Sequence, residues 1–161
     1  MFVPGSEWIY KKIIDASQDA IIMADKNGIL RLWNGGAQSI FGYSADEAVG
    51  KTLDLIIPDR FRERHWIGYT EVIATSVTKY SKSMLAVPAL RKDGTRISIE
   101  FTLTLLEDVN GSLQGIAAII RDVTTRRNEE NEIKKKLAVL EEASKEEDVL
   151  ASRSVFKSDS M

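Results

Sequence analysis

Residues 95–106 read TRISIEFTLTLL, and apolar and polar side chains alternate along most of this stretch. Alternation of this length predicts a β-strand with one buried side and one solvent-facing side. The flanking segments 83–90 and 113–122 predict two further strands, because RKDG at 91–94 and DVNG at 108–111 supply hairpin turns. The second half of the chain therefore predicts three consecutive antiparallel strands.

The first half of the chain predicts a strand pair followed by helices. Residues 20–24 and 29–33 are short β-prone runs joined by KNG at 26–28, and the helical segments lie at 37–41, at 44–47 and after Pro58. Another helix is expected from Ser6 to about residue 16. Because strands and helices segregate, we predict an α+β fold in which helices cover one face of an antiparallel sheet.

Composition limits the possible functions. The 161 residues carry 22 basic and 24 acidic side chains, which gives a net charge of −2. The chain therefore has no overall positive electrostatic field that would attract nucleic acid. The absence of cysteine excludes disulfides, cysteine-ligated metals and thiol catalysis. No apolar run reaches the length of a membrane span, and no leader opens the chain, so we expect a cytoplasmic protein with no membrane or nucleic-acid partner.

The only histidine, His65, lies in PDRFRERHWIGYTEVIAT at residues 58–75. As a helix, this stretch places His65 on an apolar stripe together with Phe61, Tyr69, Val72 and Ile73. A buried neutral imidazole can be a core residue or can offer a ring nitrogen to a metal. The pattern leaves both readings open. No carboxylate pair or nucleophile motif suits catalysis, so we do not expect an enzyme.

The chain resembles PAS domains of the sensory-box type over roughly residues 6–125. The resemblance rests on the order and spacing of short motifs: WN at 33–34, FGYS at 41–44, EAVGK at 47–51, RKDGT at 91–95 and IRDVT at 120–124. It implies a PAS fold, a five-stranded antiparallel sheet with helices on one face, plus N-terminal and C-terminal flanking helices. It also implies a sensor that forms a homodimer and signals to a separate protein, such as a kinase or chemoreceptor.

The domain boundaries follow from this resemblance and from composition. We predict an N-terminal flanking helix at 1–17, a PAS sensor domain at 18–123, a C-terminal signalling helix at 124–147 and a disordered tail at 148–161. In the signalling helix, Ile133, Leu137 and Leu140 have coiled-coil spacing, and this seam fades at Ser144 and Glu147.

Within the family, RHWIGY at 64–69 resembles the long helix of the haem-binding oxygen sensors of nitrogen-fixation kinases. This resemblance implies that His65 is the proximal ligand of haem b, and that the domain senses a diatomic gas: O₂, CO or NO. An apolar pocket could enclose the macrocycle. The candidate cofactor-binding residues are His65, Tyr69, Leu85, Val87, Ile99, Phe101, Leu103, Ile116, Ala118 and Ile120.

The sequence departs from those sensors on the first long strand. The place of their gas-binding arginine falls on Leu85, which cannot donate a hydrogen bond, so we expect CO to be favoured relative to O₂. The adjacent Met84 is a possible distal iron ligand. Two alternatives remain open: a cofactor-free interaction and dimerisation module, or a small-metabolite sensor. FAD is a further possible cofactor, although the flavin and cinnamoyl subfamilies that need a cysteine are excluded.

Overall fold

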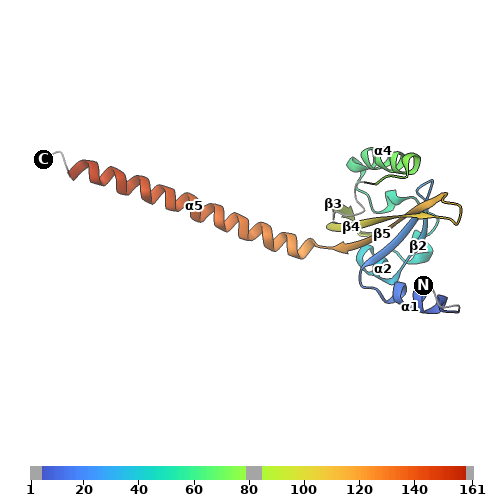
Figure 1. Ribbon diagram of the computed structural model, residues 1–161. Coiled ribbons are helices and arrows are strands. Elements are labelled where there is room, and N and C mark those ends of the chain that lie inside the picture. The colour runs from blue at the N-terminus through green and yellow to red at the C-terminus, as the bar shows by residue number, and fades with distance from the viewer. Residues whose placement is uncertain (1–4, 79–84, 159–161) are drawn as a thin grey trace. The chain divides into compact units, whose positions relative to one another are not determined.

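A five-stranded antiparallel sheet in the order β2-β1-β5-β4-β3 organises the chain (Figure 1). The computed structural model describes residues 5–78 and 85–158, with the side chains of 85 and 151–158 outside the described part. The strands are β1 Ala20–Asp25, β2 Leu30–Trp33, β3 Leu85–Leu90, β4 Arg96–Glu107 and β5 Leu113–Asp122. The predicted α+β class and five-stranded sheet are confirmed.

Helices occupy the stretch between β2 and β3, as expected. They are α2 Gly35–Phe41, α3 Ala45–Ala48, the 3-10 helix η1 Leu53–Leu55 and α4 Asp59–Thr75, and α1 Glu7–Ala16 precedes the sheet. The predicted capping box forms at α3, where the Ser44 hydroxyl accepts from the Glu47 amide and the Glu47 carboxylate accepts from the Ser44 amide. The 3-10 helix η1 has no counterpart among the predicted elements.

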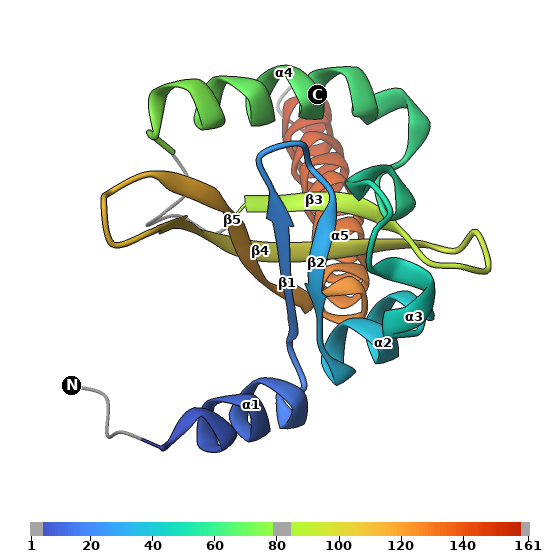
Figure 2. The ribbon, with the colours of Figure 1, turned by 90° about the vertical axis from the view of Figure 1, so that its right-hand side faces the viewer.

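The register of the strands places most of their buried apolar side chains on one face of the sheet, called here the inner face. Residues paired directly across antiparallel strands share a face. Phe101 of β4 pairs with Ile120 of β5, and Leu103 pairs with Ala118. The inner face packs with side chains from the helices into one core, in which Phe41 and Leu30 are fully buried. Figure 2 shows α4 crossing above the tip of the β1–β2 hairpin.

The C-terminal helix α5, Thr124–Ser158, forms a separate unit. The predicted end of this helix at 147 and the predicted disordered tail from 148 are wrong for residues 148–158, which are helical. Helix formers continue past the point where the apolar seam fades, and helix propensity does not need that seam. The seam residues Ile133, Leu137 and Leu140 are all exposed.

The buried side chain of Asn34 joins three segments near the start of the fold. Its Oδ1 accepts hydrogen bonds from the amides of Ile21 (2.8 Å) and Ala37 (2.9 Å). Its Nδ2 donates to the carbonyls of Ile14 (2.8 Å) and Asp19 (3.1 Å). Asn34 thereby caps α2 and ties the end of α1 to β1, so one amide fixes where the helical half begins relative to the sheet.

We predict that Asn34→Ala lowers the free energy of unfolding by about 3 kcal/mol, because it leaves several buried backbone groups without a hydrogen-bond partner. Urea unfolding followed by circular dichroism measures this change. Asn110→Ala, at an exposed turn residue, is the matched control and should stay close to wild type. Equal losses in the two variants would show that Asn34 does not have this role.

Candidate functional site

His65 lies on the buried stripe of α4, one helical turn before the buried Tyr69. Its imidazole is partly buried and packs against the rings of Trp66 and Tyr69, with centroids 5.1 Å and 5.7 Å away. The Nδ1 atom is inaccessible to solvent and has no hydrogen-bond partner among the described residues. Buried polar atoms are normally satisfied, so this nitrogen distinguishes His65 from the other described side chains of α4.

The electrostatic surroundings keep the His65 ring neutral. Burial lowers the pKa of His65 below its ordinary value of 6.5, since the charged imidazolium loses its hydration. The carboxylate of Asp54 acts in the opposite direction and does not cancel the effect of burial. A neutral imidazole is the form that offers a lone pair to a metal.

Tyr69 holds α4 on the sheet. Its hydroxyl lies 2.6 Å from the carbonyl of Asp25 and 3.3 Å from that of Ala24, and it can donate to either. Burial and the nearby Asp25 carboxylate raise the pKa of Tyr69, so the phenol stays protonated as a donor. Tyr69, which was predicted to bind a cofactor, therefore uses its hydroxyl to hold α4 against β1.

The predicted pocket wall divides into two groups by burial. Ile99, Ile116 and Ile120 are buried in the core. The remaining described wall residues are only partly buried, although all share the inner face: Val87, Phe101, Leu103 and Ala118. The second group is the part of the predicted wall that keeps some exposure to solvent.

Two predicted residues are described incompletely or not at all. Leu85 pairs through its backbone with Phe101, and its side chain lies outside the described part. Met84, the possible distal ligand, lies outside the described residues.

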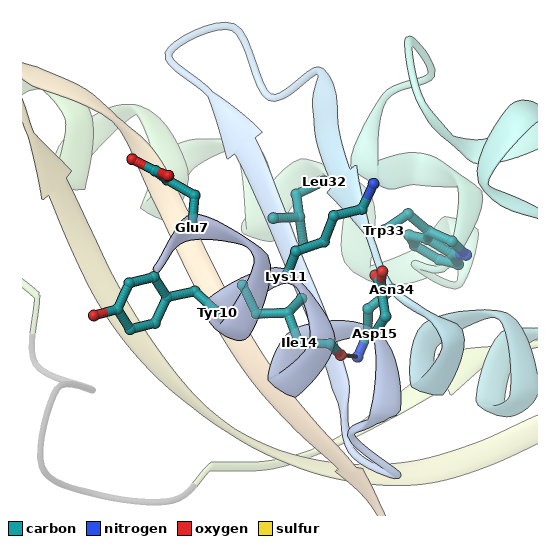
Figure 3. Close-up of a pocket in the computed structure, with 8 residues that line it drawn as sticks. All are labelled: Glu7, Tyr10, Lys11, Ile14, Asp15, Leu32, Trp33 and Asn34. Atoms are coloured by element: carbon teal, nitrogen blue, oxygen red, sulfur yellow. Dashed lines mark hydrogen bonds between the residues drawn. The ribbon is translucent and has the colours of Figure 1, made fainter. Parts of the chain in front are cut away.

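Two hollows of the described surface lie away from His65. One, of about 460 Å³, lies between α1 and β2, with Ile14, Leu32 and Trp33 among its lining residues (Figure 3). The other, of about 270 Å³, lies between the end of α2 and the β3–β4 turn. Within the described residues, no group of three or more His, Cys, Asp or Glu side chains could hold a metal ion.

Sequence reasoning missed the contacts on the Asp54 side of His65. The indole Nε1 of Trp66 donates to the Asp54 carboxylate at 2.8 Å, and the same carboxylate lies 3.7 Å from the Arg62 guanidinium. No local pattern predicts this pair, because η1 and α4 are joined here by a tertiary contact.

The sheet order, the helices between β2 and β3 and the long strands β4 and β5 together describe a known architecture. The sequence profile of the PAS fold matches residues 14–128. This chain belongs to the PAS family. The PAS domain of a protein from Colwellia psychrerythraea superimposes with a TM-score of 0.64 at 24% identity, covering 73% of this chain and 97% of that one. At this identity the likeness shows the fold alone.

Two curated relatives extend the comparison. An uncharacterised protein of Azorhizobium caulinodans is 32% identical over 122 residues, and the sensor protein FixL of Bradyrhizobium diazoefficiens is 28% identical over 114 residues. These alignments cover 75% and 71% of this chain but only 16% and 22% of the relatives. This PAS domain is thus a sensory domain of the kind found in sensor proteins such as FixL. No described helix is both long and apolar enough to span a bilayer.

We predict that the stability of this PAS domain depends on pH through His65. Because folding lowers the pKa of His65, the unfolded state binds more protons as pH falls through about 6.5, and stability must fall with it. His65→Gln should remove this component of the loss between about pH 7 and the folded pKa. Urea unfolding at several pH values measures the difference.

The C2 proton of the single histidine gives an independent measurement by NMR titration. We expect its midpoint below 6.5 in the folded protein. A midpoint at or above that value would mean that burial does not control this ring.

Proposed function

We propose that this PAS domain is a haem-based sensor in which His65 ligates the iron of haem b. The observation that carries the proposal is the solvent-inaccessible, unpartnered Nδ1 of a neutral imidazole on the buried side of α4. An unsatisfied buried polar atom costs about 1–3 kcal/mol, so a ligand that engages this ring could offset that cost. The resemblance of residues 64–69 to nitrogen-fixation oxygen sensors supports the same ligand.

The residues of the site fit such a group. His65 supplies a neutral nitrogen ligand, and haem when bound supplies an iron able to take a diatomic gas. The partly buried side chains Val87, Phe101, Leu103 and Ala118 supply an apolar wall that excludes water. Leucine at 85 provides no hydrogen-bond donor to a gas, so CO should be favoured relative to O₂.

A specific observation favours a second function. The hollow between α1 and β2 and the hollow beside the β3–β4 turn are not lined by His65 or by the predicted wall, and the imidazole already packs against two aromatic rings. His65 would then be a core residue in a cofactor-free interaction module or in a small-metabolite sensor. A flavin bound on the inner face is a further alternative. None of these functions requires catalysis, and we propose a non-enzymatic role.

Signal output is proposed to pass through a homodimer to a separate kinase or chemoreceptor. The helix α1 exposes a set of apolar side chains that the domain itself leaves uncovered: Trp8 (65% exposed), Ile9 (40%) and Ile13 (62%). Exposed large apolar side chains gathered on one short helix are typical of a protein interface. A second copy of the domain is the partner proposed here.

We predict that the purified protein binds hemin in a one-to-one complex with an intense Soret band. His65→Ala should lose this ligation, because no other histidine exists in the chain. Added imidazole should restore the ligation spectrum of His65→Ala, since it enters the space that the side chain left. Absorption titration and a pyridine haemochrome assay measure binding and stoichiometry.

The matched control for this experiment is Ile67→Ala, on the exposed side of the same helix, where the side chain is 65% exposed. It should bind hemin as the wild type does. If the wild type binds no hemin, or if His65→Ala keeps the wild-type spectrum, then His65 is not a haem ligand and the cofactor-free reading replaces it.

We also predict that Trp8→Glu and Ile13→Glu weaken dimerisation, because each places a charge in an apolar contact. Sedimentation velocity over a range of concentrations measures the monomer–dimer equilibrium. Lys12→Glu, on the same helix, changes a residue that is already charged and serves as the control. An unchanged dimer in both apolar variants would assign the interface to another element.

A further inference from the structure

Two side chains next to His65 hold α4 on the β1–β2 hairpin and on η1. The Tyr69 hydroxyl bonds to carbonyls at the end of β1, and the Trp66 indole N–H donates to Asp54 in η1. The rings of Trp66 and Tyr69 also meet each other edge to face, with centroids 5.6 Å apart. His65 contacts both rings, so its surroundings are set by these anchors.

The Trp66 ring also rests on the turn of the hairpin, at Gly28. A Cβ atom at Gly28 would overlap the six-membered part of the Trp66 indole. Gly28 also has φ +74°, where glycine is favoured over other residues. Glycine is therefore required at this position for two reasons: the turn conformation, and the room that the indole occupies.

The hairpin beneath Trp66 is well fixed. The Asp25 carboxylate accepts hydrogen bonds from the amides of Asn27 (2.9 Å) and Ile29 (3.1 Å) and pairs with Arg31. The strand β1 continues this order into the inner face, because Ala24 pairs with Ile116 of β5. A displacement of Trp66 is therefore transmitted to the sheet through this hydrogen-bonded turn.

We propose that Trp66, seated on Gly28 and hydrogen-bonded to Asp54, is a positioning residue for His65, so that ligand binding at His65 and the conformation of the β1–β2 hairpin are coupled. The coupling to a ligand rests on the proposed function. The positioning of His65 by Trp66 concerns only residues of this chain. Energetic coupling between two sites is reciprocal: if the ligand at His65 favours the present hairpin conformation, it stabilises the hairpin, and a change at Gly28 that disturbs this conformation weakens ligand binding.

The His65–Trp66 contact explains how a change at Gly28 reaches the imidazole. The two rings meet at an interplanar angle of 77°, so the edge of one lies against the face of the other. If the indole is lifted off Gly28, this contact and the bond to Asp54 cannot both persist. The His65 ring then loses a packing surface on one side, and its orientation is no longer unique.

The test compares Gly28→Ala with Gly111→Ala. Both glycines have positive φ, +74° and +76°, so both variants carry a similar backbone strain. A Cβ at Gly111 meets nothing within 4 Å, whereas one at Gly28 displaces Trp66. The difference between the two variants therefore isolates the displacement of Trp66.

We expect Gly28→Ala to weaken hemin binding about tenfold relative to Gly111→Ala, a size usual for coupled sites. Hydrogen–deuterium exchange of residues 24–30 should slow when hemin binds to the wild type and should respond less in Gly28→Ala. In the hemin-free protein, amides around residues 62–70 should exchange faster in Gly28→Ala than in Gly111→Ala, because α4 has lost an anchor.

Conservative variants separate positioning from general stability. Asp54→Asn keeps an oxygen acceptor for the Trp66 N–H and should bind hemin nearly as the wild type does. Asp54→Ala removes the acceptor and Trp66→Phe removes the donor. Both variants should bind hemin more weakly than the wild type and should show an altered ligation spectrum.

If the wild type binds no hemin, the proposed function fails, while exchange in the hemin-free variants still tests the positioning role. Equal exchange in α4 for Gly28→Ala and Gly111→Ala would overturn that role. In a protein that does bind hemin, equal hemin affinity of the two variants would overturn the coupling.

Discussion

The amide of Asn34 is bonded on all sides: two backbone amides donate to its oxygen and two carbonyls accept from its nitrogen. It lies where β2 ends and α2 begins, so these bonds set the direction in which the chain leaves the sheet. The first turn of α2 and the end of α1 are held against β1 as a consequence. A buried amide is costly unless every polar atom is satisfied, and here this requirement selects one arrangement.

His65 differs from Asn34 in whether its buried polar atoms have hydrogen-bond partners. The polar atoms of Asn34 are satisfied, whereas Nδ1 of His65 is enclosed without a described partner. Its neighbours on α4 are firmly anchored: Tyr69 by carbonyls of β1 and Trp66 by Asp54. We propose that these anchors preorganise His65 as a ligand position, and that the partly buried residues of the inner face supply the apolar wall.

Local patterns were sufficient for most of the fold. Alternation in residues 95–106 identifies β4 and its inward residues. Because successive side chains of a strand point to opposite faces, the proposed wall is then predicted to share one face. This alternation cannot predict which wall residues are only partly buried, because that depends on how the helices pack over the sheet. The helix α5 continues beyond its apolar seam, and η1 is too short to have a period. The contact of Trp66 with Gly28 and Asp54 joins distant segments, so only the folded chain reveals it.

A single histidine makes the central claim directly measurable. In protein with isotope-labelled histidine, zinc protoporphyrin is a diamagnetic stand-in for haem that accepts one axial nitrogen. If His65 is the ligand, its ring protons lie directly over the macrocycle, and their NMR signals should shift strongly upfield when the porphyrin binds. Ring-proton signals that stay at their porphyrin-free positions while the porphyrin is bound would contradict ligation by His65, and with it the haem-sensor account.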